Sequence, residues 1–599
     1  MRLAFHRALW PAAMVVAGGC GDLAWNADQE PAYLELAPED TLVAPGDSIH
    51  LELRVFDRED NPLPGPPDWA AVKWEWTDTN AVEVAQDGRL LTHKGGDVWV
   101  TAHLAGLRDW TRLKINPSRI VLRAPLIYLN QVIQDREGSV PLIAGRPALL
   151  RIFATGHEVS FYRPTVRAVL YRDGEIVLTG EIPLESEVLP DQPDESRIDR
   201  SFNMEIPGEL IQPGLELVVE LDTENTVPKV LGSKTRYPPG GAMPLDIVEM
   251  PVFQQTFLPT TDYYNRHDTR VFEWLKGIGP ESHHVQVARA LLPIGEMEVF
   301  VHDTVYTTQD LTTKDGWRDY LRQIEVIWKM EGEKGYYYGV VVPPRGTAWS
   351  GLGYYTKPVS VGSNSPRIYA HEVGHNMSLR HAPCGKVGRS DPEFPFLDGS
   401  IGTWGYDFRH GRVMSPEFRK DVMGYCVPAW ISAYHFKKAM NYRLSTSQTP
   451  AEPAEPQQTL MLWGSASRGE VLLEPAFLVE TVPDMPTGGG VWRLTGFGPG
   501  GERVFDFGFS PDETEHGGAN FRFNIPWDPE RDGAIESVVL SGPDGEVTLS
   551  RSSTPPMAII RDRATGQVRA ILDNWAGDLT RVGGDVEVMV SEGLPGGRN

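Results

Sequence analysis

The chain has 599 residues, enough for several domains, and its 60 glycines and 49 prolines favour turn-rich β-structure around one mixed α+β unit. The formal net charge is −25, and no basic run is long enough to follow a phosphate backbone, which excludes nucleic acid as a partner. No internal stretch is apolar enough for a transmembrane helix.

The first twenty residues have the features of an export signal. Basic residues precede an apolar stretch over residues 8–16, which Pro11 interrupts, so the stretch is too short to span a bilayer permanently. Small residues at 17–19 then precede Cys20, and this arrangement resembles the bacterial lipobox, in which the cysteine is acylated after cleavage. We predict a lipoprotein signal peptide over residues 1–20, with lipidation of Cys20. By resemblance to the sorting rule of Gram-negative bacteria, we expect an outer-membrane or cell-surface lipoprotein, with simple secretion as the alternative.

Residues 21–117 are predicted to form a β-sandwich. Apolar and polar residues alternate at 49–55 and again at 98–102, so each run buries one face of a strand. The Asp-Gly turn over residues 87–90 and the glycine pair at 95–96 resemble those of bacterial immunoglobulin-like modules.

The β-pattern continues over residues 118–250. Strand patterns occur at 148–153 and 215–221, and a hairpin turn is expected at 172–174. A second β-sandwich is the simplest interpretation of this region.

Residues 251–444 form the predicted α+β unit. Apolar residues recur at helical spacing over 317–328, and a buried strand is expected at 336–342. The glycine- and tyrosine-rich stretch at 351–355 is a candidate edge strand that another backbone could approach closely, with an ordinary glycine-rich loop as the alternative. A closing helix is expected at 430–440.

Within this unit, His371, Glu372, His375 and His381 stand in the order His-Glu-x-x-His-x-x-x-x-x-His. Residues four apart on a helix lie one above the other, so His371 and His375 can bind one metal ion. Glu372 is offset from the helix face that carries the two histidines, so it can reach a water on the metal without binding the metal. Ser365-Pro366 supplies the helix start.

The third histidine requires a turn. His381 cannot share the face of His371 and His375, so the helix has to end after about Leu379. Three protein nitrogens leave the fourth position of a zinc ion open, as in catalytic rather than structural sites. His410 has no ligand spacing and is interpreted as a surface or core histidine.

The run HEVGHNMSLRHAPCG, which begins at His371, resembles the signature of the metzincin clan of zinc peptidases. It is most similar to secreted bacterial members that cut mucin-type glycoproteins. Met423 stands where the clan places the methionine beneath the metal. Tyr425 stands where several members carry a tyrosine that contacts the zinc or stabilises the transition state, with a packed aromatic as the alternative.

Ser378 departs from this signature, which has glycine at that position. Glycine adopts positive φ without steric cost, whereas a serine forced into the left-handed region costs about 1–2 kcal/mol. If the turn follows the clan, Ser378 has to adopt that conformation.

The resemblance implies a zinc metalloendopeptidase. A Zn²⁺ ion held by three neutral imidazoles lowers the pKa of its bound water to about 7. Glu372 would take the proton as that water attacks a peptide carbonyl and pass it to the departing amine, while zinc and Tyr425 would stabilise the oxyanion. The expected substrates are extracellular proteins, including glycoproteins. Iron in the same ligand set is one alternative, and a catalytically inactive cell-surface adhesion or binding protein with a retained peptidase fold is another, against which the intact Glu372 argues.

Two cysteines remain once Cys20 is assigned to the signal. Cys384 follows His381 by three residues and Cys426 follows Tyr425, so a bridge between them would tie the loop of the third ligand to the methionine turn. In an exported chain this even pair predicts a disulfide. Two free thiols and a second metal site are the alternatives.

A proline- and glutamate-bearing segment at 445–458 is the predicted linker to a last unit. Hairpin patterns follow, one around the turn at 542–545 and one within 557–572. We predict a C-terminal β-domain over 459–599 that either binds glycan or braces the enzyme. We expect a monomer, although no sequence feature determines the oligomeric state.

Overall fold

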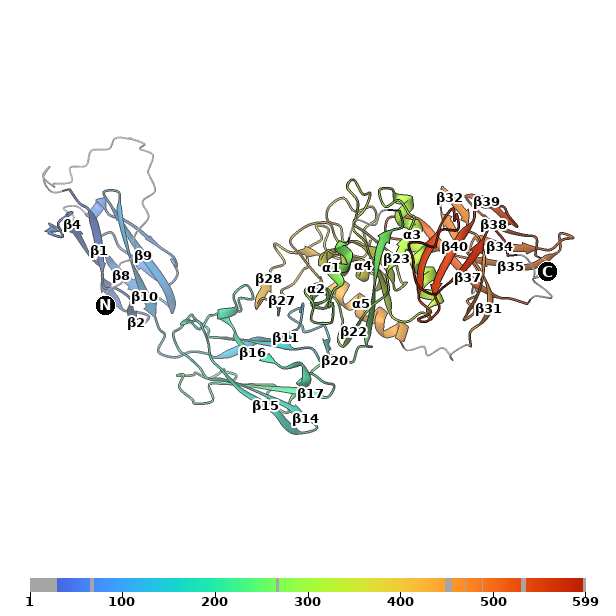
Figure 1. Cartoon of the computed structure of the whole chain (residues 1–599). Coiled ribbons are helices and arrows are strands. Elements are labelled where there is room, and N and C mark those ends of the chain that lie inside the picture. Colours follow the sequence, from blue (N-terminus) through green and yellow to red (C-terminus); the bar gives the residue numbers. More distant parts are fainter. Residues whose placement is uncertain are drawn as a thin grey trace.

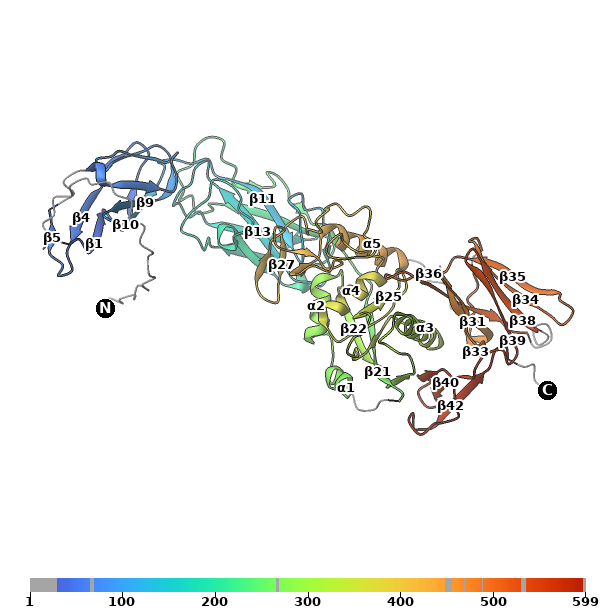
Figure 2. The same ribbon diagram turned by 90° about the horizontal axis from the view of Figure 1, so that it is seen from above.

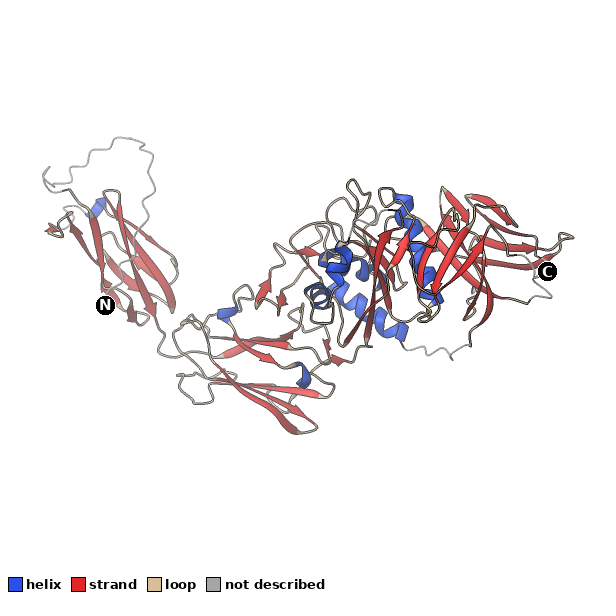
Figure 3. Ribbon diagram, viewed as in Figure 1, coloured by secondary structure: helices blue, strands red, loops and turns tan. Residues whose placement is uncertain are grey.

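The computed structural model describes residues 30–64, 69–264, 269–447, 455–467, 469–486, 488–528 and 535–595. The predicted signal peptide and Cys20 therefore lie outside the described residues, as does part of the predicted linker. The β-units follow one another along an extended molecule, and the α-helices gather in its middle (Figures 1, 2 and 3). No helix in the described ranges has the length and apolar character needed to cross a membrane.

The first unit is the predicted β-sandwich. Its sheets have the strand orders β1-β4-β5, β2-β10-β9-β6 and β3-β8-β7. The predicted alternation is present in β9, where Val98, Val100 and Ala102 face the core. The strands are β1 (Tyr33–Ala37), β2 (Thr41–Val43), β3 (Ser48–His50), β4 (Glu52–Phe56), β5 (Pro62–Leu63), β6 (Lys73–Trp76), β7 (Val82–Val84), β8 (Arg89–Thr92), β9 (Gly96–Leu104) and β10 (Leu107–Ile115).

The second unit packs a sheet of order β11-β13-β16 against one of order β15-β14-β17-β18, to which β19 also pairs. The predicted hairpin joins β14 to β15, and Asp173 in its turn has a φ of 53°. The strands are β11 (Arg123–Asn130), β12 (Leu142–Ile143), β13 (Ala148–Thr155), β14 (Val166–Arg172), β15 (Glu175–Ile182), β16 (Phe202–Ile206), β17 (Leu215–Leu221), β18 (Arg236–Tyr237), β19 (Met243–Pro244) and β20 (Ile247–Val248).

The third unit is built on one large sheet of order β25-β26-β24-β21-β23-β41-β40-β42, with β22 also paired to β21. Strands β21 to β24 and β26 are mutually parallel, whereas β25 at the edge is antiparallel to β26. The stretch at 351–355 thus contains an edge strand. These strands are β21 (Phe253–Asp262), β22 (Met297–Val301), β23 (Val305–Thr307), β24 (Tyr336–Val340), β25 (Gly351–Gly353) and β26 (Val359–Gly362).

Helices cover both faces of this sheet. Neighbouring residues of β24 belong to different cores: Tyr337 packs with α3, and Tyr338 packs with α4. The closing helix α5 begins and ends later than the predicted span of 430–440. The helices are α1 (Arg270–Leu275), α2 (His283–Leu291), α3 (Lys314–Met330), α4 (Pro366–Asn376) and α5 (Ala433–Ser447); two short pairs, β27 (Gly405–Asp407) with β28 (Arg412–Met414) and β29 (Lys420–Asp421) with β30 (Ala429–Trp430), lie between α4 and α5.

The C-terminal region corrects one prediction. Strands β40 (Met557–Asp562), β41 (Val568–Leu572) and β42 (Val586–Ser591) continue the large sheet through pairing of β41 with β23, so residues 459–599 do not form a separate β-domain along their whole length. Sequence periodicity identified the hairpin but carries no information on its distant partner strand. The remaining strands form two sheets: β31 (Gln457–Ser467), β32 (Glu470–Leu473), β33 (Phe477–Thr481), β36 (Asp512–Glu513) and β37 (Ala519–Pro526) in one, and β34 (Trp492–Phe497), β35 (Arg503–Phe509), β38 (Ser537–Gly542) and β39 (Gly545–Ser550) in the other.

Candidate metal centre

Two of the predicted ligands lie on α4. Ser365 precedes the helix and Pro366 occupies its first turn, as the sequence predicts. His371 and His375 are one turn apart, and their Nε2 atoms are separated by 3.1 Å. Both side chains are buried. The helix therefore presents two imidazoles to a single point.

A left-handed serine ends α4. The helix stops at Asn376, earlier than the predicted end near Leu379, because Ser378 adopts a φ of 67°. The Ser378 N–H donates to the His375 carbonyl at 2.9 Å, and the Leu379 N–H donates to the Gly374 carbonyl at 3.1 Å. These two bonds form a Schellman motif, in which glycine normally supplies the left-handed residue. The departure from the metzincin signature is thus accommodated by strain at Ser378.

This turn brings the third histidine to the other two. The ring centroid of His381 lies 4.8 Å from that of His375 and 5.3 Å from that of His371. The His381 side chain is buried. All three predicted ligands therefore meet in one cluster.

Replacement of Ser378 by glycine should stabilise the protein by about 0.5–1 kcal/mol, because the relief of left-handed strain exceeds the added freedom of glycine in the unfolded chain. Urea unfolding measures the difference. Ser415→Gly is the control, since Ser415 does not have positive φ and glycine there should lower the free energy of unfolding. Equal destabilisation by both substitutions would show that this turn stores no strain.

Hydrogen bonds orient the two helical ligands. His371 Nδ1 lies 2.8 Å from the Val422 carbonyl oxygen, and His375 Nδ1 lies 2.7 Å from the Leu379 carbonyl oxygen. Because a carbonyl only accepts, each Nδ1 donates and each Nε2 keeps a lone pair for a metal. Burial lowers the pKa of His375 to about 4, so that ring is neutral at pH 7. The tautomers are those that metal binding requires.

The methionine turn lies against α4. An ideal Cβ on Gly374 would be only 2.6 Å from Met423 Sδ, so a glycine in the helix lets the methionine pack closely beside the ligands. Cys384 and Cys426 form the predicted disulfide, which joins the His381 loop to the methionine turn. The alternatives of free thiols and of a second metal site built from these cysteines are thereby eliminated.

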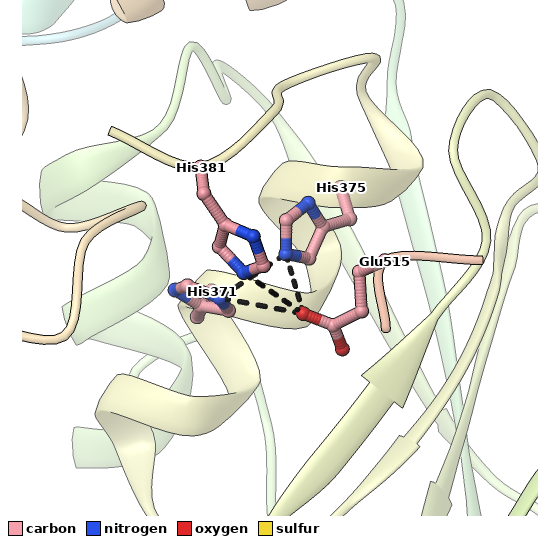
Figure 4. Close-up of side chains that lie close together, drawn as sticks. All are labelled: His371, His375, His381 and Glu515. Carbon is pink, nitrogen blue, oxygen red and sulfur yellow. Dashed lines mark hydrogen bonds and ion pairs between the residues drawn. The ribbon is translucent and has the colours of Figure 1, made fainter. Parts of the chain in front are cut away.

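A fourth buried side chain, Glu515, completes the cluster (Figure 4). Its Oε2 lies 2.7 Å from His375 Nε2, 3.2 Å from His381 Nε2 and 3.6 Å from His371 Nε2. The four ligand atoms lie within 4.8 Å of one another, and three imidazoles with one carboxylate are a donor set that suits zinc. Burial alone would raise the pKa of Glu515, but the imidazoles lower it well below its usual range.

The sequence did not predict Glu515. It lies between β36 and β37, far downstream of the histidines, and it has no motif spacing relative to them. Its neighbours His516, Gly517 and Gly518 give a turn signal, but a turn signal identifies no metal ligand. Only the fold places this carboxylate at the metal centre.

Glu372 lies between α4 and the edge strand. A Cβ on Gly351 would collide with Glu372 Oε1, and a Cβ on Gly353 would lie 3.3 Å from Oε2, so the two glycines allow β25 to approach this carboxyl group closely. Burial, together with the nearby charge of Glu515, raises the pKa of Glu372 well above its usual range. Within the described ranges Oε2 has no hydrogen-bond partner. The neutral, protonated form of this carboxyl group is therefore favoured.

Tyr425 lies at the same cluster. Its hydroxyl oxygen is 3.3 Å from His381 Nε2, and the residue is 39% exposed, which distinguishes it from a tyrosine packed in the core. Burial of part of the ring raises the pKa of Tyr425, so the hydroxyl stays protonated at neutral pH. By contrast, His410 contacts Asp407 Oδ2 at 2.9 Å, on the hairpin of β27 and β28, and does not belong to the cluster.

A cavity of about 700 Å³ opens beside the cluster. A volume of this size is typical of substrate sites. Its walls include residues from α4, the edge strand, the methionine turn and the β36–β37 loop: Trp349, Gly351, His371, Glu372, Tyr425 and Glu515.

Residues 327–457 match the family model of Peptidase M66. The matched segment contains the three histidines, Glu372 and the methionine turn, and it supports a metal-dependent peptidase. Glu515 and the three last strands of the large sheet lie outside it.

A "Dictomallein-like protein" of Hahella chejuensis (strain KCTC 2396) is 32% identical over 76 residues. That alignment covers 12% of this chain and 12% of the relative. It is thus a short local similarity, which agrees with the family match.

Solved structures give only distant similarities. Titin Ig tandem domains A164-A165 are 12% identical with a TM-score of 0.18, over 36% of this chain and 97% of that one. Sidekick-1 immunoglobulin domains 1-5 are 12% identical with a TM-score of 0.15, over 36% of this chain and 40% of that one. The S-layer protein rSbsC(31-844) is 12% identical with a TM-score of 0.13, over 37% of this chain and 28% of that one. Scores this low assign no fold.

Proposed function

We propose that the chain is a metzincin-like zinc endopeptidase that hydrolyses extracellular proteins. The observation that supports this most strongly is the convergence of three Nε2 atoms beside Glu372, within the segment that matches Peptidase M66. His371, His375 and His381 would hold the ion. When bound, Zn²⁺ would supply Lewis acidity toward a carbonyl and lower the pKa of water.

Glu372 is the proposed general base. Its buried carboxyl group lines the cavity, where it can accept a proton from water during attack on a peptide carbonyl and return it to the leaving amine. The raised pKa of Glu372 favours its protonated form. A divalent ion nearby would lower that pKa toward the range of a general base.

Strand β25 is the proposed binding edge for an extended substrate. It lies at the end of the large sheet, antiparallel to β26, and Glu372 lies directly beside its glycines. A peptide added to this edge would bring its backbone alongside the carboxyl group that moves the proton.

Replacement of Tyr425 by phenylalanine should lower kcat about 10²-fold with little change in KM, because the variant loses one donor to the developing oxyanion. Steady-state hydrolysis of a fluorogenic casein measures both constants. Tyr355→Phe is the control, since its ring packs edge-on against His375 with centroids 5.2 Å apart. Unchanged kcat in Tyr425→Phe would assign Tyr425 a packing role only.

Metal removal is the direct test of the proposed function. The Zn²⁺-loaded protein should cleave casein or mucin, lose that activity in a chelator and regain it when Zn²⁺ is restored. Elemental analysis of the purified protein identifies the native ion. Activity that persists after verified removal of the metal would refute the mechanism. If the active protein contained iron and no zinc, the proposed ion would be iron.

Glycoproteins are the proposed substrate class, and one observation beyond the resemblance supports them. Lys314, Arg367, Lys386 and Arg389 also line the cavity, and this positive charge would favour substrates with acidic substituents. Comparison of cleavage of a mucin before and after removal of its sialic acids tests the preference. Equal rates of cleavage of the two mucin forms would show that the positive charge of the cavity does not favour acidic glycoproteins.

We further propose that the protein is a lipid-anchored monomer at the outer membrane or cell surface, with secretion as the alternative. The small residues before Cys20 support this placement. Mass spectrometry of the mature N-terminus tests it, because an acylated Cys20 and a free N-terminus differ in mass. Size-exclusion chromatography with light scattering tests the monomer.

A non-catalytic binding protein is the second candidate, and one observation favours it. Glu515 takes the place at the histidine cluster that an open catalytic site leaves for water or substrate. Absence of protein cleavage by the Zn²⁺-loaded wild type and by variants of Glu515 would support this candidate over the peptidase.

A further inference from the structure

One loop of the C-terminal β-region reaches the metal centre. Residues 514–518 join β36 to β37, and we name them the 514–518 hairpin. The Thr514 N–H donates to the Gly518 carbonyl at 3.2 Å, and Gly517 and Gly518 have φ of 76° and 103°. The glycine pair thus permits a tight, internally bonded turn with Glu515 on the side of the histidines (Figure 4).

The backbone of this region lies along the edge strand. The Tyr355 N–H donates to the Glu513 carbonyl at 3.2 Å, and the Glu515 N–H donates to the Gly353 carbonyl at 3.3 Å. An extended peptide that binds a sheet edge makes hydrogen bonds of this kind. Residues 513 and 515 therefore occupy backbone groups of Gly353, the last residue of β25, and of Tyr355 just beyond it. An extended substrate on this edge would need the same groups.

The Glu515 side chain links the edge strand to the metal centre. Its Oε1 accepts a hydrogen bond from the Gly353 N–H at 3.2 Å, while Oε2 lies among the three Nε2 atoms. Oε1 thus has a backbone donor, Oε2 faces the histidine nitrogens, and the side chain is 1% exposed. A carboxylate in this position is a fourth donor, which closes a site that a catalytic metal keeps open.

Side-chain contacts hold the hairpin in place. His516 stacks on Trp349 with ring centroids 4.6 Å apart, and Arg318 Nε donates to the Gly517 carbonyl at 3.3 Å. Asp512, just before the hairpin, pairs with Lys357 at 2.6 Å. The contacts come from α3 and from the segments before and after β25, so the hairpin is held at a defined position.

We propose that Glu515 is a fourth protein ligand of the metal and that the 514–518 hairpin is a built-in competitive inhibitor of the site. In this conformation the hairpin closes the metal centre and occupies the Gly353 end of β25. An extended substrate displaces it by making the same backbone hydrogen bonds. The proposal that the hairpin acts as an inhibitor at β25 rests on the proposed peptidase function. The ligand role of Glu515 is independent of catalysis.

Zinc binding tests the ligand role. In competition with a chromogenic chelator, Glu515→Gln should bind Zn²⁺ at least about tenfold more weakly than the wild type, and Glu515→Ala more weakly still. Glu513→Gln is the matched control, because it removes the same charge from the adjacent residue, whose carboxylate faces Arg380 at 3.8 Å. Equal affinity of wild type, Glu515→Gln and Glu513→Gln would overturn the ligand role.

Casein hydrolysis at saturating Zn²⁺ tests the inhibition. Glu515→Gln should raise kcat/KM at least about tenfold, mainly through a lower KM, because the open form becomes more populated. Equal cleavage by wild type and Glu515→Gln would overturn the inhibition and leave the peptidase standing. Weaker zinc binding without cleavage by any variant would overturn the peptidase and the inhibition and leave the ligand role standing.

Hydrogen exchange provides a readout that needs no activity. In the Zn²⁺-loaded wild type, the amides of Gly353 and Tyr355 should be protected by their bonds to the hairpin region. Both should exchange at least about tenfold faster in Glu515→Gln, while circular dichroism stays unchanged. Protection that is the same in both proteins would show that Glu515 does not hold the hairpin on β25.

Discussion

Replacement of Glu372 by glutamine is expected to lower the kcat for protein hydrolysis by about 10²–10⁴-fold, the usual contribution of a general acid–base group. The amide keeps the shape of the carboxyl group but cannot take a proton from water. Because burial and the charge of Glu515 already favour the neutral form of Glu372 when no ion is bound, the neutral amide should not destabilise the fold. The loss should therefore appear in catalysis and not in folding.

Zn²⁺ affinity separates this effect from the loss of a ligand. Glu372→Gln should bind Zn²⁺ as tightly as the wild type, because the three imidazoles and the carbonyl partners of His371 and His375 are unchanged. Glu393→Gln, at an exposed position of the same unit, should keep full activity. A Glu372→Gln protein with wild-type kcat would refute the proposed mechanism.

Removal of the disulfide by the double replacement Cys384→Ser and Cys426→Ser should lower the free energy of unfolding by about 4 kcal/mol in the chain-entropy model. The sequence separation of the two cysteines is 42, so the unfolded chain gains the freedom of a large loop. The same bridge joins the His381 loop to the methionine turn, so Zn²⁺ affinity should fall with stability. Denaturant unfolding and chelator competition measure the two effects.

A reductant supplies the control for this prediction. Dithiothreitol should lower the stability of the wild type by a similar amount and leave the double variant unchanged, since the described structure contains one disulfide. If the wild type and the double variant unfold at the same urea concentration, the bridge contributes no stability and the prediction fails.

The ligand helix could be predicted because its signals are local. Ser365-Pro366 starts α4, and the four-residue spacing of His371 and His375 places both rings on one face. The position of Ser378 in the signature also predicted a left-handed residue, which the structure contains. Each of these features depends on residues close together in the chain.

Two features that depend on distant parts of the chain were not predicted. Glu515 belongs to the turn of a hairpin that resembles many other turns, and its role follows only from the docking of that hairpin on β25. The pairing of β41 with β23 likewise joins segments whose periodicities are those of ordinary strands. The sequence pattern identified the individual strands and turns, but not which of them would be in contact in the folded protein.

Strands β40–β42 hydrogen-bond into the same sheet whose β24 packs against α4. Synthesis proceeds from the N-terminus, so the scaffold of the metal centre is incomplete until residues near 591 have emerged. A nascent polypeptide that ends before residue 557 lacks three strands of that scaffold. If the chain is the peptidase that we propose, it would therefore stay inactive throughout most of its own translation.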